Sequence, residues 1–112
     1  DCLFRTFVAE ACEAKNLLGR VEEFWCMPVT EFDPDCVDAV RSATAELGYP
    51  GMEMVSGAGH DALHVAKVAP TSMIFVPCKD GVSHNEAEDA KPEDLEAGCN
   101  VLLHAMLRMA AA

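Results

Sequence analysis

Residues 33–48 carry a complete set of helix start and stop signals. Asp33 suits the N-cap position, and Pro34 suits the first turn, where a missing backbone N–H costs nothing. Gly48 suits the residue that follows the last turn. The sequence therefore predicts a helix from 34 to 47, whose inward stripe is Val37, Val40, Ala43, Thr44 and Leu47.

Short apolar runs follow this helix and alternate with further helical segments. MEMV at 52–55 and SMIFV at 72–76 are typical of strands, the second one buried on both faces. Between them we expect a helix over about 60–69, ended by Pro70. Strands and helices in alternation indicate an α/β layer with at least two parallel strands.

The N-terminal residues already follow a helical pattern. An amphipathic helix is expected over 2–18, with Gly19 in the C′ position, followed by a short extended segment around 21–29. A last helix is expected from Pro92 to about Met109. Because the first pattern opens at the first residue without a cap or a leader, we expect that the chain is cut from a longer protein.

Composition narrows the class of protein. The 112 residues suffice for one domain with a modest core. With 8 basic and 19 acidic side chains the net charge is -11, which disfavours nucleic acid and anionic membrane surfaces as partners. No apolar run reaches the roughly eighteen residues that a membrane span requires. The six cysteines form no CxxC pair, and we interpret them as buried free thiols of a cytoplasmic protein.

Three of the four histidines lie between residues 56 and 89. Packing or capping is favoured for His104, which lies in the last helix, and for His64, which follows His60 by one turn without an intervening glutamate. His60 itself follows SGAG at a strand-to-helix turn, where a ligand can approach the backbone closely. Asp61 beside it could cap the helix or orient the imidazole. From spacing alone, a binding turn and a purely structural turn fit equally well.

His84 lies in a polar loop after the apolar run at 72–76, at the expected carboxyl end of the sheet. Open α/β sheets bind their ligands at that edge. Asp80, Glu86 and Glu88 are close to it in the sequence, so the loop could contribute metal ligands. A zinc site needs at least three protein ligands, however, and one histidine among solvated acids favours an ordinary surface loop.

Longer motifs resemble those of one enzyme family. They are SGAGHDA at 56–62, MIFVPCKDGVSHN at 73–85 and KPEDLEAGCNVLLHAMLRMA at 91–110, together with RVEEFW and FDPDCVDAV nearer the N-terminus. In these segments the chain resembles the C-terminal end of the amidase, hydantoinase/carbamoylase family. This is the M20-type group of two-metal amidohydrolases that includes N-carbamoyl-L-amino acid hydrolase, allantoate amidohydrolase and β-ureidopropionase. The likeness spans nearly the whole chain, and GAGHDA is its sharpest motif.

The resemblance implies a reaction and a role for each motif residue. The reaction is metal-dependent hydrolysis of linear amide or carbamoyl C–N bonds, with two divalent ions for which zinc, manganese, cobalt and nickel are all suitable. His84 matches a metal-ligating histidine of this site. Gly59 and His60 match the turn that lines the substrate pocket, and Asp61 matches the residue that holds this turn and its histidine in place. The implied partners are a small carbamoyl or ureido amino acid and, in the complete enzyme, the second subunit of a homodimer.

The resemblance also implies a fold and a division of the chain. Residues 31–112 would be the C-terminal part of an exopeptidase-like catalytic α/β domain, and residues 1–30 the end of its lid domain. The family's other metal ligands and its glutamate base have no counterpart in these 112 residues. We therefore expect the chain to supply one metal ligand of an incomplete site and to be inactive alone. Two alternatives stay open: a non-catalytic interaction module or relic derived from this fold, and an M20 aminoacylase or peptidase.

Overall fold

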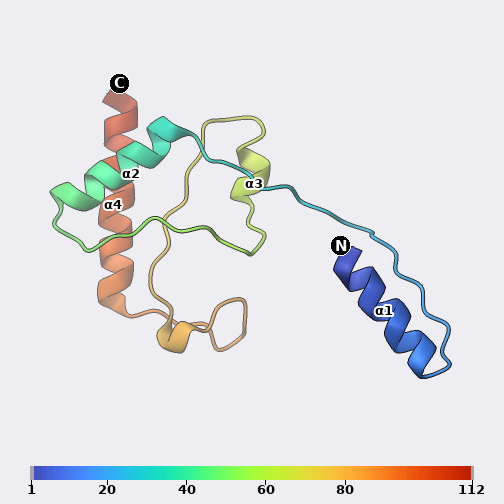
Figure 1. Ribbon diagram of the computed structural model, residues 1–112. Helices are drawn as coiled ribbons and strands as arrows, with labels where there is room; N and C mark the ends of the chain where they lie inside the picture. Colours follow the sequence, from blue (N-terminus) through green and yellow to red (C-terminus); the bar gives the residue numbers. More distant parts are fainter. Residues whose placement is uncertain (1, 112) are drawn as a thin grey trace.

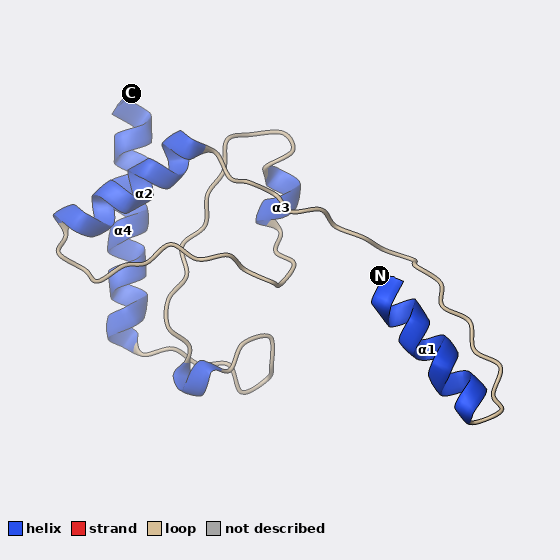
Figure 2. Ribbon diagram, in the orientation of Figure 1, coloured by secondary structure: helices blue, strands red, loops and turns tan. Residues whose placement is uncertain are grey.

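Helices are the regular elements that the computed structural model forms over residues 2–111, the residues it describes (Figure 1). The α-helices are α1 (Cys2–Ala14), α2 (Pro34–Glu46), α3 (Ala62–Val65) and α4 (Pro92–Ala111). A short 3-10 helix, η1 (Lys79–Gly81), precedes α4. Figure 2 shows the connections within this range as loops, without a strand.

The core lies where α2 crosses α4 (Figure 1). Its buried residues are small: Ala39 and Ala43 come from α2, and Val101 and Ala105 come from α4. Short side chains at a crossing allow two helix backbones to approach closely. Partly buried residues surround this contact, namely Val40, Leu47, Tyr49 and Ile74. The core is narrow, and no large side chain within residues 2–111 is fully buried.

Polar contacts join α4 to α2 and to the turn that follows α2, at the edge of this core. The Asn100 side-chain amide donates to the Tyr49 hydroxyl at 3.1 Å. Arg108 of α4 forms an ion pair with Glu46 at the end of α2. The hydrogen bond and the charge of the Arg108 guanidinium lower the pKa of the Glu46 carboxyl. The protonated form of the Glu46 carboxyl is therefore disfavoured while the two helices are in contact.

The predicted ends of α2 are confirmed. The Asp33 carboxylate accepts the Cys36 N–H at 3.0 Å, which satisfies a free donor of the first turn, and Pro34 is the first helical residue. Gly48 follows the last turn with a φ of 71°, the left-handed conformation that glycine adopts without strain. Predicted inward residues that contribute to the core are Val40, Ala43 and Leu47.

α1 ends earlier than predicted. Asn16, and not Gly19, takes the left-handed conformation after the helix, with a φ of 54°. The Leu17 N–H then donates to Cys12 O at 2.8 Å and the Asn16 N–H donates to Glu13 O at 3.1 Å, which is the paired bonding of a Schellman cap. Asparagine tolerates left-handed φ better than most residues, so Asn16 ends the helix before Gly19 is reached.

The expected α/β layer is not confirmed, because neither predicted strand pairs with another within residues 2–111. A strand requires ladder hydrogen bonds to a neighbouring strand, and the runs at 52–55 and 72–76 have none. The run at 72–76 packs on the helices instead: Ile74 contacts the core, and the Ser72 hydroxyl donates to Cys36 O at 3.3 Å. Gly98 of α4 makes room for this run, because an added Cβ would lie 2.6 Å from Val76 Cγ1.

The helix predicted over 60–69 is reduced to the single turn of α3. After Val65 the chain continues in tighter turns, as in the bond from the Val68 N–H to Val65 O at 2.9 Å. Pro70 disfavours helical backbone in the residue before it, which prevents helical turns from continuing beyond Ala69.

The chain as a whole is extended. Its radius of gyration is 19.9 Å, whereas about 13 Å is typical of a compact domain of this length. α1 and the segment that follows it stand away from the α2–α4 unit (Figure 1). Large apolar side chains are exposed along the chain, among them Leu3, Phe7, Leu18, Phe24 and Met52. Exposed apolar surface of this extent is typical of surfaces that contact other protein segments.

All six cysteines are free, as predicted, but the prediction that they are buried was wrong. Cys2, Cys26 and Cys99 are exposed, and the other three are half-buried, because the narrow core covers few side chains. Partial burial, with the hydrogen bond and charge of Asp33, raises the pKa of the Cys36 thiol. Within residues 2–111, no helix is both long and apolar enough to cross a membrane.

Candidate functional site

Two histidine loops meet in the structure. The imidazoles of His60 and His84 lie edge to face, with ring centroids 5.7 Å apart and 79° between the ring planes. Phe75, from the run at 72–76, contacts His60 in a similar way, with centroids 5.3 Å apart. Side chains from three separate segments therefore converge at one point.

The turn before α3 holds His60 through Ser56. The Ser56 hydroxyl lies 2.8 Å from His60 Nε2 and also accepts the Ala58 N–H at 3.2 Å. The hydroxyl can either donate to Nε2 or accept from it, and in both cases Nδ1 is the His60 ring nitrogen that Ser56 leaves open. Gly59 faces open space, with no neighbouring atom within 4 Å of an added Cβ. A ligand can therefore approach the backbone at Gly59.

Asp61 lies at the N-cap of α3, but its carboxylate forms no capping hydrogen bond. Its backbone carbonyl accepts the His64 N–H at 2.9 Å and the Val65 N–H at 3.2 Å. The side chain that bonds to the His60 ring is Ser56, which was not predicted from the sequence. Its position could have indicated this role, because serine in a tight turn readily bonds to groups a few residues away.

His84 lies in an exposed loop and adopts an uncommon backbone conformation. Its φ of 57° lies in the left-handed region, which few residues other than glycine occupy. The His84 N–H donates to Glu88 Oε2 at 2.8 Å. Its ring nitrogen Nδ1 lies 3.1 Å from the Ser83 hydroxyl. Both the backbone and the ring of His84 therefore have fixed partners within the loop.

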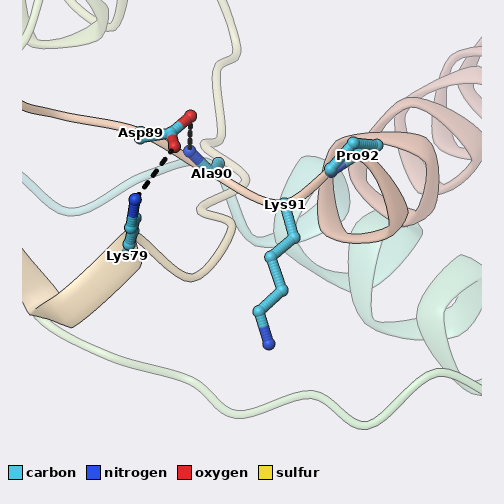
Figure 3. A pocket seen from close by; sticks show the side chains of 5 residues that line it. All are labelled: Lys79, Asp89, Ala90, Lys91 and Pro92. Carbon is cyan, nitrogen blue, oxygen red and sulfur yellow. Dashed lines mark hydrogen bonds and ion pairs between the residues drawn. The ribbon is translucent and has the colours of Figure 1, made fainter.

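A neck of contacts closes the loop that carries His84. The Lys79 N–H donates to Asp89 O at 2.7 Å, and the Lys79 ammonium lies 3.8 Å from the Asp89 carboxylate (Figure 3). The Lys91 side chain points away from this pair in the same view. Together with Ala90 and Pro92, these residues line a hollow of about 470 Å³ at the base of the loop. The histidine pair does not line this hollow.

A larger hollow of about 710 Å³ lies between α2, the run at 72–76 and α4. Its lining is mostly apolar, with Ile74, Val76, Leu102 and Met106 among the contributors, and it includes no histidine. Its surface continues into the exposed apolar face of α4, where Leu102 and Met106 are open to solvent. Converging polar groups are found at the histidine pair, and we locate the candidate site there.

His84 has one ring nitrogen that its loop does not engage. With Nδ1 engaged by Ser83, Nε2 is the nitrogen that can bind a metal, and ligating histidines are commonly held in this way. No group of three His, Cys, Asp or Glu side chains within residues 2–111 is placed to hold an ion. The donors in this part of the chain do not hold a metal ion by themselves.

The acids near His84 have different roles, which the sequence did not distinguish. Glu88 bonds to the loop that carries His84, whereas Glu86 is exposed to solvent. Asp80 lies within η1 in a left-handed conformation, with a φ of 56°. Phe75 was expected only as part of a buried strand, yet it is half-exposed and contacts His60. These contacts depend on how the loop folds back on itself, and sequence spacing does not encode that.

The sequence matches a known protein family over most of its length. Residues 19–108 match the sequence profile of Peptidase family M20/M25/M40. An N-carbamoyl-L-amino-acid amidohydrolase of Rhizobium meliloti is 59% identical over 83 residues, which cover 74% of this chain and 20% of that protein.

Two solved structures are similar along nearly the whole chain. An amidase of the hydantoinase/carbamoylase family from Burkholderia multivorans is 55% identical with a TM-score of 0.86, covering 96% of this chain and 26% of that one. A second such amidase, from Burkholderia vietnamiensis, is 53% identical with a TM-score of 0.82, covering 93% of this chain and 25% of that one. The chain therefore spans about a fifth to a quarter of the length of these relatives.

Proposed function

Because the chain belongs to peptidase family M20/M25/M40, we propose that it forms part of a metal-dependent hydrolase of linear amide or carbamoyl C–N bonds. Its resemblance to the hydantoinase/carbamoylase amidases of this group is confirmed. The proposed substrates are N-carbamoyl amino acids or ureido acids, in line with the name of the relative from R. meliloti. The observation that carries the proposal is the meeting of His60 and His84, one from each of the sharpest motifs.

His84 would hold one of two divalent ions through Nε2. Zinc, manganese, cobalt and nickel all accept an imidazole ligand. A bound divalent ion would lower the pKa of a water molecule and polarise a substrate carbonyl. The contribution of this chain is to present Nε2 from a fixed place, since Ser83 holds the ring and Glu88 holds the backbone of His84.

We assign Gly59, His60 and Asp61 to substrate binding. With its Nε2 beside the Ser56 hydroxyl, His60 leaves Nδ1 open to a polar group of the substrate. Gly59 has backbone that a ligand can approach. The Asp61 carbonyl accepts the His64 and Val65 N–H groups and so fixes the end of the turn at the start of α3. The edge contact with Phe75 restrains the plane of the His60 ring.

Other parts of the proposed enzyme would complete both the site and the fold. In this proposal residues 31–112 belong to a catalytic α/β domain and residues 1–30 to the end of a lid domain. Two features support this division: the extended runs at 52–55 and 72–76 have no strand partner, and many apolar side chains are exposed. Further layers of structure would pair the runs and cover the apolar side chains. The chain alone would be inactive, and the complete enzyme would be a cytoplasmic homodimer.

The experiment uses the complete reading frame that contains this chain. His84→Ala should lose one of two bound metals, measured by elemental analysis, and most of the hydrolysis of an N-carbamoyl amino acid. His60→Ala should keep both metals and lose turnover. His64→Ala is the matched control, because its imidazole is exposed on α3 and lies outside the pair. Full metal content with normal turnover in His84→Ala would refute the ligand assignment.

A non-catalytic interaction module is the second candidate, because exposed apolar side chains are also what a docking surface presents to a partner. Such a module would fold alone, so the chain as printed should show a cooperative thermal transition and a single monomer or dimer peak. A molten, aggregating chain would favour the enzyme instead, since unpaired strand edges and apolar faces would be exposed. Assays of acyl-amino acids against carbamoyl-amino acids on the complete protein separate an M20 aminoacylase from a carbamoylase.

A further inference from the structure

Glu88 uses both of its carboxylate oxygens inside the loop that carries His84. Its Oε2 accepts the His84 N–H at 2.8 Å. Its Oε1 lies 3.5 Å from the Ser83 hydroxyl and 3.7 Å from the Cys78 thiol. Both oxygens are engaged by the protein, so the role of Glu88 lies in what it holds in place.

The turn that follows His84 brings Glu88 back to it. The Glu88 N–H donates to Asn85 O at 2.9 Å, and the Asn85 side chain accepts the Ala87 N–H at 2.9 Å. Asparagine commonly closes turns with such bonds. The Glu88 carboxylate then receives the N–H of His84, whose left-handed backbone needs a partner of this kind to persist.

The Ser83 hydroxyl connects Glu88 to the imidazole of His84. Its oxygen lies 3.5 Å from Glu88 Oε1 and 3.1 Å from His84 Nδ1. A hydroxyl has one hydrogen to donate, and an ionised carboxylate can only accept. A hydroxyl that donates to Glu88 can meet Nδ1 only as an acceptor. The neutral imidazole then carries its proton on Nδ1, and Nε2 keeps its lone pair.

We propose that Glu88 is a positioning residue that sets the tautomer of His84 through Ser83 and leaves Nε2 as the metal-binding nitrogen. This inference rests on the proposed function of His84 as a ligand. The neck formed by Lys79 and Asp89 closes the same loop without Glu88. A change at Glu88 therefore acts on the inside of the loop while its base stays closed.

The tautomer is measured on the complete metal-free enzyme by long-range ¹⁵N–¹H correlation under mildly alkaline conditions. His84 should show a protonated Nδ1 and an unprotonated Nε2. In Glu88→Gln one of the two acceptor oxygens becomes an amide nitrogen, which cannot accept a hydrogen bond. The side chain then no longer accepts from both Ser83 and the His84 N–H, and His84 should move toward a mixture of tautomers. Glu86→Gln is the matched control, since it removes the same charge from an exposed position in the same loop.

Metal affinity is measured on the complete enzyme by competition between Zn²⁺ binding and a chelator. Glu88→Gln and Ser83→Ala should each weaken Zn²⁺ binding by about 10- to 100-fold, the usual effect of losing a partner of a ligating histidine. Ser83→Thr keeps the hydroxyl and should restore the affinity. A purely structural role of the serine would not distinguish alanine from threonine in this way.

Two results would overturn the proposal: a protonated Nε2 of His84 in the unaltered chain, or equal Zn²⁺ affinity in Glu88→Gln and Glu86→Gln. His84→Ala separates this failure from failure of the proposed function. If His84→Ala keeps both metals, His84 is not a ligand and the proposed function fails. If it loses one metal while Glu88→Gln behaves as the unaltered protein, only the positioning role is refuted.

Discussion

Replacing Gly98 by alanine should loosen the contact between α4 and the run at 72–76, although alanine is the better helix former. The gain in helix propensity is about 1 kcal/mol. The cost comes from Val76, because the new Cβ would lie 2.6 Å from Cγ1 of a stiff, β-branched side chain. Overpacking of this kind costs about 1–3 kcal/mol. We expect a net destabilisation of up to about 2 kcal/mol, a factor of about 30 in the opening equilibrium.

A second substitution tests the cause of this effect. Val76→Ala removes Cγ1, so in that background Gly98→Ala should stabilise α4 by about 1 kcal/mol. The same change should therefore have opposite signs in the two backgrounds, with a coupling energy of about 1–3 kcal/mol. Native-state hydrogen exchange of the α4 amides measures each opening free energy without requiring the whole chain to unfold together. Equal effects within about 0.5 kcal/mol in both backgrounds would refute the reasoning from close contact.

Two titratable groups give further predictions. Because Arg108 lowers the pKa of Glu46, their ion pair contributes fully above the ordinary glutamate value of about 4.3 and is lost as the pH falls through the lowered folded value. Helix content by circular dichroism should therefore fall more steeply on acidification in the unaltered chain than in Glu46→Gln, and identical profiles would contradict this. The raised pKa of the Cys36 thiol predicts slow alkylation by iodoacetamide, with exposed Cys26 reacting faster. Mass spectrometry of the labelled peptides checks the order, and faster labelling of Cys36 would count against it.

Features that depend on a few neighbouring residues were predictable from the sequence. Both ends of α2 follow from Asp33, Pro34 and Gly48, because capping acts within one turn of the helix. The start of α4 at Pro92 follows for the same reason. The end of α1 was mispredicted because two residues compete for the left-handed position, and Asn16 comes before Gly19.

Features that depend on distant partners were not predictable in the same way. Apolar runs at 52–55 and 72–76 have the composition of strands, but a strand exists only where another lies beside it. Spacing alone did not predict the meeting of His60 and His84, and only the family resemblance assigned both residues to one site. The hydroxyls and the carboxylate that hold these rings lie within tight turns, where their direction follows from backbone angles that the residue types do not specify.

The left-handed backbone at His84 sets the stability of the loop against the role proposed for this residue. Such a φ costs a residue other than glycine roughly 1–2 kcal/mol. Glycine would adopt the same angles without strain, so the loop taken by itself would favour His84→Gly. Selection of random variants for heat tolerance alone should therefore enrich glycine at position 84, and under the proposed function the tolerant variants should have lost a metal. Under the same proposal, selection for turnover should retain the histidine and its strain.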